Sequence, residues 1–186
     1  MLSIIISGMP ASGKSTLAQG IAKIYHLKFY SGGDALKELA KEFGFSEGGV
    51  DWWDKEEGMK FLRKRKENYE IDKKIDDKLI SLLKEGNVVI TSYPLAWLYK
   101  DAIKIWLKAS QEKRIERVAK RDNISLEEAK RVILVRDEEN KLLYRELYGI
   151  RLDEDLSVFD LVINTDILDD EKVLRIVCKI IDEIKK

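Results

Sequence analysis

A short glycine-containing segment near the amino terminus limits the fold of this chain more than any other feature, and it reads Gly8-Met9-Pro10-Ala11-Ser12-Gly13-Lys14-Ser15-Thr16. It follows the apolar run Leu2–Ser7, which contains consecutive isoleucines and is typical of a buried parallel strand. After it, a helix is expected from about Gly13 to Tyr25. A strand that passes through a short loop into a helix is the opening unit of an α/β fold.

The same segment fits the pattern Gly-x4-Gly-Lys-Ser, in which glycines let successive backbone N–H groups converge on one anion. Lys14 is placed to reach the β- and γ-phosphates of ATP, and the Ser15 hydroxyl is a suitable Mg²⁺ ligand. A glycine turn that merely joins a strand to a helix is the alternative. Because strand, loop, lysine and serine are all in register, we expect residues Gly8–Thr16 to bind ATP.

The rest of the chain alternates between strand and helix patterns. Apolar runs predict strands at 28–30, 88–90, 103–107 and 161–163, and helical spacing predicts helices at 34–43, 69–83, 111–121, 126–148 and 170–184. Asp34 is placed to cap the first of these helices, and Ser125 with Glu128 forms a capping box. Residues 50–68 show no clear pattern and are expected to hold a loop and a charged helix.

These elements predict an α/β fold of three layers, in which a mainly parallel sheet of about five strands lies between helices. A length of 186 residues with 45% hydrophobic content suits one domain, residues 1–186.

Composition excludes several classes of function. With 34 basic and 34 acidic residues the net charge is zero, and no apolar run approaches the roughly 20 residues of a membrane span. We therefore expect a cytoplasmic protein, a monomer or small homo-oligomer, without nucleic-acid or membrane partners. Because His26 and Cys178 are the only residues of their kinds, disulfide frameworks, Cys/His zinc sites and histidine triads are excluded.

Other features favour a kinase over a switch GTPase or an ATP-driven motor. The chain has no Asn-Lys-x-Asp run, and the predicted strand that ends near Thr91 lacks a terminal acidic residue. Phosphoryl transfer needs cations that close over the phosphates. Arg117 and Arg121 lie four apart on one helix face, and Arg131, Arg136 and Arg145 follow. For any single arginine, a solvated helix with ordinary ion pairs is the alternative.

Further motifs extend over nearly the whole chain apart from roughly 48–68. They are Ser31–Lys37, Asn87–Val89 with Trp97, Ile105–Ala109, Arg117-x3-Arg121-Asp122 with Ile124-Ser125, Tyr148–Ile150, and Leu156–Thr165. With the phosphate loop, these motifs resemble those of the nucleoside monophosphate kinases, most closely the archaeal-type cytidylate kinases.

That resemblance implies a P-loop kinase with a mobile acceptor-binding lobe, about residues 31–84, and a lid, about residues 121–150. It implies that Arg117 lies against the adenine of ATP and that Arg121 and Arg136 brace the transferred phosphates. Together with Lys14 these two arginines are the expected catalytic residues.

The acceptor side is expected to include Asp34 and Lys37, again by resemblance. The implied cofactor is Mg²⁺ bound with ATP, and Ser15 is its expected protein ligand.

Departures from the family pattern gather on the acceptor side. Lys37 replaces an arginine, Asp77 replaces another, and Thr91–Ala96 replaces a stretch that includes a third. In the lid, Leu143 stands where an arginine is expected, and Arg151 stands where an acid is expected. Fewer fixed guanidinium groups weaken the grip on a nucleotide phosphate, so the acceptor stays open.

Residues 48–68 look longer than their family counterpart and carry Trp52, Trp53 and the basic run Arg63–Lys66. In one interpretation these residues rebuild the acceptor pocket, where a tryptophan stacks on a base or sugar and a basic residue replaces a lost arginine. In the other, the tryptophans are a buried packing anchor and the basic run belongs to a solvated helix. Adjacent tryptophans favour the packing anchor. Asp72 and Asp76, one helical turn apart, are either an acceptor-side pair or a solvated face, and the solvated face is favoured.

Three functions follow in order of preference. The first is transfer of the γ-phosphoryl group of ATP to CMP or dCMP, which yields ADP and CDP or dCDP. The second is a related kinase with another acceptor, either another nucleotide or an alcohol for which Asp34 would be the base. The third is a nucleotide-binding regulator without transferase activity.

Overall fold

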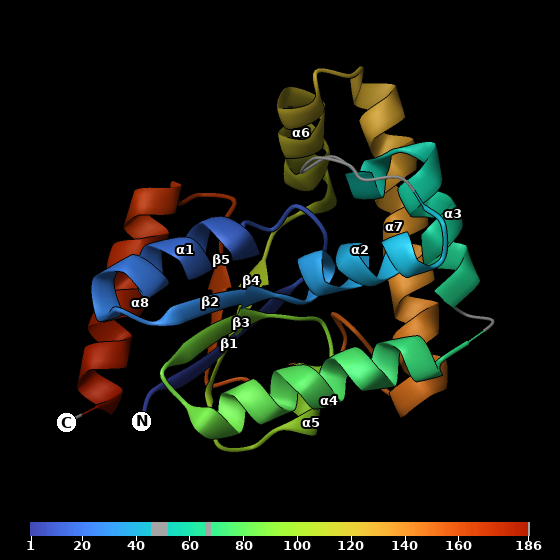
Figure 1. Ribbon diagram of the computed structural model, residues 1–186. Coiled ribbons are helices and arrows are strands. Elements are labelled where there is room, and N and C mark those ends of the chain that lie inside the picture. Colours follow the sequence, from blue (N-terminus) through green and yellow to red (C-terminus); the bar gives the residue numbers. More distant parts are fainter. Residues whose placement is uncertain (46–51, 66–67, 186) are drawn as a thin grey trace.

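A computed structural model describes residues 1–45, 52–65 and 68–185 and has a parallel five-stranded sheet at its centre (Figure 1). The strands are β1 (Ser3–Gly8), β2 (Lys28–Ser31), β3 (Val88–Thr91), β4 (Ile103–Lys108) and β5 (Leu161–Asn164). Their order is β2-β3-β1-β4-β5, and each of the four pairings is parallel. The predicted α/β class and sheet are confirmed, and β1, which leads into the phosphate loop, is the central strand.

Helices cover both faces of the sheet. They are α1 (Lys14–Tyr25), α2 (Gly32–Glu42), α3 (Glu56–Lys64), α4 (Glu70–Glu85), α5 (Leu95–Leu98), α6 (Gln111–Asp122), α7 (Leu126–Tyr148) and α8 (Asp170–Ile184), with a 3₁₀ turn, η1 (Trp52–Asp54). The limits predicted for α7 and α8 agree with the structure, and the charged helix expected within 50–68 is α3. The short helix α5 was not predicted, because one turn is too short to carry a helical period.

Alternate residues of β1 supply the two halves of the core. Ile4 and Ile6 pack with α1 and α8 on one face, whereas Ile5 packs with α2, α4 and α5 on the other. Figure 1 shows α1 and α8 together on one side of the sheet and α4 with α5 on the opposite side. A strand buried on both faces explains why Leu2–Ser7 is continuously apolar rather than alternating.

The cap predicted for α2 was wrong. Ser31 rather than Asp34 is the N-cap, since its hydroxyl accepts a hydrogen bond from the Asp34 backbone N–H at 3.2 Å. A Cβ atom at Gly32 would lie 3.1 Å from the Thr91 carbonyl oxygen, so glycine lets the β2–α2 corner pass close to the end of β3. Both Gly32 and Gly33 therefore belong to the first turn of α2.

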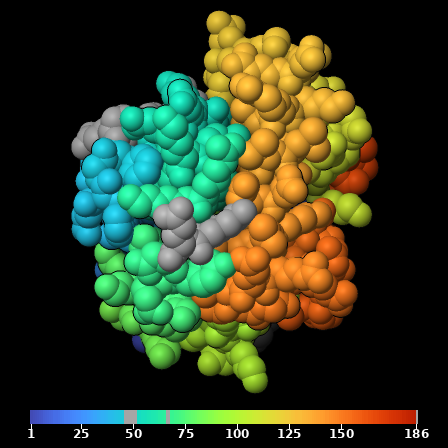
Figure 2. Space-filling view, turned by 90° about the vertical axis from the view of Figure 1, so that its right-hand side faces the viewer, coloured from blue at the N-terminus to red at the C-terminus, as the bar shows by residue number. Residues whose placement is uncertain are grey.

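The paired helices α6 and α7 rise from the sheet, and α3 packs against α7 (Figures 1 and 2). Met59 of α3 contacts an apolar cluster between α6 and α7 that consists of Val118, Ala129, Val132 and Ile133. Within the described residues, no helix combines the length and the apolar character that crossing a membrane requires.

The position of Ile5 leads to a stability prediction. The side chain is fully buried in the central strand, so Ile5→Ala should lower the free energy of unfolding by about 2–5 kcal/mol. Urea unfolding followed by circular dichroism measures this change. Ile167→Ala is the control, because Ile167 is 83% exposed and its truncation should change stability by less than about 0.5 kcal/mol.

Candidate active site

A cavity of about 520 Å³ lies at the carboxyl edge of the sheet, between the phosphate loop, α2, α4, α6 and α7. Among the residues expected from the sequence, its wall includes Pro10–Thr16, Asp34, Lys37, Arg117, Arg121 and Arg136. Gly8 and Met9, the first two residues of the loop, are buried and do not form part of the wall. One cavity thus brings together residues from both halves of the chain, and ligands of parallel α/β sheets bind at this edge.

The phosphate loop is held in a conformation that requires glycine. Gly8 has a φ of 152°, and a Cβ atom there would lie 2.5 Å from the Leu107 carbonyl oxygen of β4. The first turn of α1 contains no acidic residue, and the buried Ser12 hydroxyl has no hydrogen-bond partner among the described residues. A helix N-terminus without acidic side chains, next to an unpartnered hydroxyl, suits an anion.

Lys14 folds back over this loop. Its Nζ donates hydrogen bonds to the carbonyl oxygens of Gly8 at 2.8 Å and Met9 at 2.9 Å, and it lies 5.0 Å from the centre of the Tyr93 ring. Burial, together with the charges of the nearby Arg136 and Arg114, lowers the pKa of the Lys14 ammonium group to about 7. The site therefore concentrates positive charge that a bound anion would relieve.

Arg117 connects the phosphate loop to the segment after β5. Its guanidinium donates to the Ala11 carbonyl oxygen at 3.3 Å, to the Thr165 hydroxyl at 3.1 Å and to the Thr165 carbonyl oxygen at 2.8 Å. Sequence reasoning missed Arg114, one turn earlier, which forms two hydrogen bonds with Asp137 at 2.7 and 2.6 Å. The i,i+3 spacing from Arg117 was the available signal.

Arg121 of α6 and Arg136 of α7 both contact Asp54 of η1. The distance from Arg136 Nη1 to Asp54 Oδ1 is 2.5 Å, and Arg121 binds the other oxygen of Asp54 and also Asp122. Burial raises the pKa of the Asp54 carboxyl group, and the two arginines act against that shift. No sequence pattern pointed to Asp54, because it lies in the stretch without helical or strand periodicity.

Asp34 and Lys37, the residues expected to bind the acceptor, form an ion pair at 2.8 Å. The arginine-containing stretch that the resemblance implies is replaced by one that places Tyr93 against Lys14. Leu143, which the resemblance assigns to a lid, is fully buried in an apolar cluster. Arg131 and Arg145 are exposed and are not part of the cavity wall. The structure therefore does not bring those two arginines to the site.

The solvated face favoured for Asp72 and Asp76 was wrong, because both are buried and border the cavity. Asp72 pairs with the buried Arg65, whose guanidinium also donates to the Tyr144 hydroxyl at 3.1 Å. Asp76 accepts a hydrogen bond from the Tyr148 hydroxyl at 2.8 Å. Burial, opposed by the hydrogen bond from Tyr148 and aided by the charge of Asp72, raises the pKa of the Asp76 carboxyl group to about 7.

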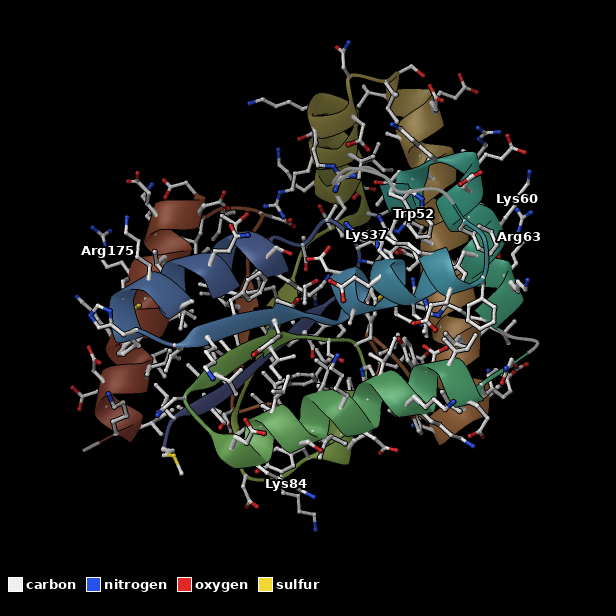
Figure 3. All side chains as sticks on the ribbon, viewed as in Figure 1. Lys37, Trp52, Lys60, Arg63, Lys84 and Arg175 are labelled. Atoms are coloured by element: carbon white, nitrogen blue, oxygen red, sulfur yellow. The ribbon has the colours of Figure 1, made fainter. Side chains whose placement is uncertain are left out.

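The two tryptophans behave differently. Trp52 is buried against Phe61, with ring centres 5.9 Å apart, and is the packing anchor that tandem aromatics favoured. Trp53 borders the cavity, as the pocket interpretation requires. Figure 3 shows Lys60 and Arg63 on the outer side of α3, away from Trp52.

No group of three or more His, Cys, Asp or Glu side chains in residues 1–45, 52–65 and 68–185 could hold a metal ion. Ser15 lies on the cavity wall next to Lys14 and supplies a hydroxyl oxygen. Mg²⁺ is commonly held by one or two protein oxygens together with phosphates and water, so this donor set fits Mg²⁺ bound with a nucleotide.

A parallel sheet in the order found here, with a glycine-rich loop leading from its central strand into α1, defines a P-loop kinase fold. Solved structures with this fold include shikimate kinase from Acinetobacter baumannii, with a TM-score of 0.62 and 16% identity over 100% of this chain and 95% of that one. Shikimate kinase from Bacteroides thetaiotaomicron matches with a TM-score of 0.53 and 15% identity over 97% and 98% of the two chains. At these identities the likeness concerns the fold alone.

Residues 3–167 match the model of the cytidylate kinase-like family, and the chain belongs to that family. The cytidylate kinase of Methanocaldococcus jannaschii is 40% identical and covers 98% of this chain and 99% of its own. Those of Sulfurisphaera tokodaii (42% identical, 94% and 92% covered) and Pyrococcus horikoshii (41% identical, 98% and 90% covered) are similarly close. The resemblance inferred from the motifs is confirmed.

The lowered pKa of Lys14 leads to a prediction on nucleotide binding. At pH 8 the free protein should hold this side chain mostly neutral, and bound phosphates should restore its proton, so that ATP binding takes up about one proton. Calorimetric titrations in two buffers of different ionisation enthalpy measure this uptake. At pH 5.5 the uptake should vanish, because Lys14 is already protonated there; equal uptake at both pH values would contradict the assignment.

The raised pKa of Asp76 leads to a prediction on stability. Because this pKa is higher in the folded chain than in the unfolded one, where it is 3.8, stability falls as the pH rises from about 4 to about 7 and remains lowered above that. Asp76→Asn should therefore raise the melting temperature at pH 8 more than at pH 5. Glu85→Gln, at the exposed end of the same helix, is the control, because Glu85 is not among the charges that shift Asp76, and it should change the melting temperature about equally at the two pH values.

Proposed function

We propose that this protein is an ATP-dependent kinase that transfers the γ-phosphoryl group to CMP or dCMP and so yields ADP with CDP or dCDP. The observation that carries the proposal is that one cavity is lined by the phosphate loop, by arginines of α6 and α7, and by Asp34 and Lys37. About 40% identity over nearly the full chain to proteins named cytidylate kinase supports CMP as the acceptor.

On the donor side, the loop Gly8–Thr16 would bind the phosphates of ATP through its backbone N–H groups and the Lys14 ammonium group. Arg117, which is fixed between Ala11 and Thr165, would lie against the adenine. Its three hydrogen bonds to loop and strand segments give it the fixed orientation that stacking on a flat ring requires.

Lys14, Arg121 and Arg136 are the proposed catalytic residues. The transition state of phosphoryl transfer carries its charge on the phosphate oxygens, and fixed cations in a cavity stabilise it without reorganisation. The nearness of Arg136 to Lys14, which contributes to the lowered pKa of Lys14, supports a shared target for both groups.

Ser15 would hold Mg²⁺ through its hydroxyl oxygen. When bound, the ion would neutralise charge on the β- and γ-phosphates.

On the acceptor side, Asp34 and Lys37 would orient the monophosphate, and Trp53 borders the space that a base would enter. An acceptor phosphate oxygen is already ionised, so no general base is needed. Residues 31–84 would act as the acceptor-binding lobe and residues 121–150 as a lid whose closure excludes water. A cytoplasmic location and a monomeric or small homo-oligomeric state remain predictions.

A second candidate is a kinase that phosphorylates a neutral alcohol, with Asp34 as the base. The observation that favours it is charge pairing, because Lys37 is paired with Asp34 and Arg65 with Asp72. These two cations are therefore already neutralised before a dianionic phosphate arrives. A nucleotide-binding regulator without transferase activity is the third candidate and predicts ATP binding without acceptor-dependent ADP release.

A coupled ADP-release assay with Mg²⁺ and ATP separates these candidates. CMP, dCMP, UMP, AMP, GMP and small alcohols are offered in turn, and CMP or dCMP should give the highest kcat/KM. Lys14→Ala should lower turnover at least about 100-fold without a change in the circular dichroism spectrum. Turnover only with an alcohol would select the second candidate, and no acceptor-dependent turnover would select the third.

A further inference from the structure

Asp54 belongs to the segment that departs most from the family pattern, yet it contacts two of the proposed catalytic residues. Its side chain is 4% exposed, and each carboxylate oxygen receives one guanidinium, Oδ1 from Arg136 and Oδ2 from Arg121. The two arginines come from different helices, α7 and α6. One carboxylate therefore fixes the distance and the relative orientation of two cations that are otherwise separate.

The arrangement leaves the arginines facing the cavity. Arg121 and Arg136 both form part of its wall, whereas Asp54 does not. Asp54 thus contacts both guanidinium groups without itself lining the cavity that phosphates would enter.

The backbone around Asp54 is tightly held. Trp52, two residues earlier, is buried, and a Cβ atom on Gly58 of α3 would lie 2.2 Å from the Trp52 carbonyl oxygen. The glycine lets the first turn of α3 pack directly on η1. Met59, the next residue, packs on the apolar cluster between α6 and α7. The turn that carries Asp54 is therefore attached to both helices whose arginines it orients.

We propose that Asp54 is a positioning residue for phosphoryl transfer, which holds Arg121 and Arg136 in one fixed geometry over the phosphate loop. The inference rests on the proposed role of these arginines toward the phosphates of ATP. Positioning of this kind acts mainly on kcat, because a small displacement of a catalytic group weakens the transition state more than the bound substrate.

The first test is Asp54→Asn. It removes the charge and keeps the shape, so kcat should fall by about 10- to 100-fold while the dissociation constant of Mg·ATP changes by less than about threefold or decreases. Asp54→Glu keeps the carboxylate and should recover part of the lost kcat. Asp182→Asn is the matched control, because Asp182 is bound to Tyr25 at the α1–α8 contact, away from the cavity, and this variant should retain full turnover.

Gly58→Ala is a second test that leaves every charge in place. The added methyl group would push η1 away from α3, so the same loss of kcat with retained ATP binding is expected. Thermal melts of all variants show whether the chain remains folded. Asp54→Asn with kcat equal to or above that of the unchanged protein would overturn the proposal in favour of a competing latch, and parallel loss of ATP affinity and kcat would indicate a merely structural residue.

The outcome is separable from that of the proposed function. If the unchanged protein does not phosphorylate CMP or dCMP, that acceptor is wrong, and kcat is measured with whichever acceptor of the panel releases ADP. If no acceptor does, phosphoryl transfer is absent and the positioning role falls with it. ATP binding to Asp54→Asn requires no acceptor, and a loss of more than tenfold in affinity would count against the inference in either case.

Discussion

The close packing of Gly8 against the Leu107 carbonyl oxygen is the contact on which the site depends. Gly8 pairs with Leu107 where β1 and β4 end side by side, so the chain leaves the sheet at its centre and turns at once into α1. Any side chain at Gly8 would move the loop away from β4. The central place of β1 then aims the N-terminus of α1 at the carboxyl edge, where the chain segments after β3, β4 and β5 also converge.

Electrostatic pairing organises the rest of the cavity. The guanidinium groups of Arg114, Arg121 and Arg136 each contact a buried or half-buried carboxylate, while Lys14 hydrogen-bonds only to carbonyl oxygens among its described contacts. Paired arginines keep a fixed orientation at little cost in charge repulsion. Burial and the residual repulsion from Arg136 and Arg114 lower the pKa of Lys14, so a bound phosphate would stabilise the charged form of this lysine.

The sequence predicted the helices and strands that are long or strongly periodic, along with the loop and three of the arginines on the cavity wall, Arg117, Arg121 and Arg136. It failed where the signal was short or where burial decided the outcome. Asp72 and Asp76 have the spacing of a solvated face, but Arg65 and Tyr148 satisfy them inside the protein. The role of Asp54 could not be predicted, because its partners Arg121 and Arg136 lie 67 and 82 positions away in the sequence and no periodic pattern links them to it.

By itself, then, the sequence determined the class of fold and the phosphate loop, because strand periodicity, glycine geometry and the loop pattern act over a few neighbouring residues. Only the tertiary structure decided which carboxylates are buried, which arginines reach the cavity and what holds them there. Those outcomes depend on desolvation and on contacts between segments far apart in the chain, and local order along the sequence does not encode such contacts.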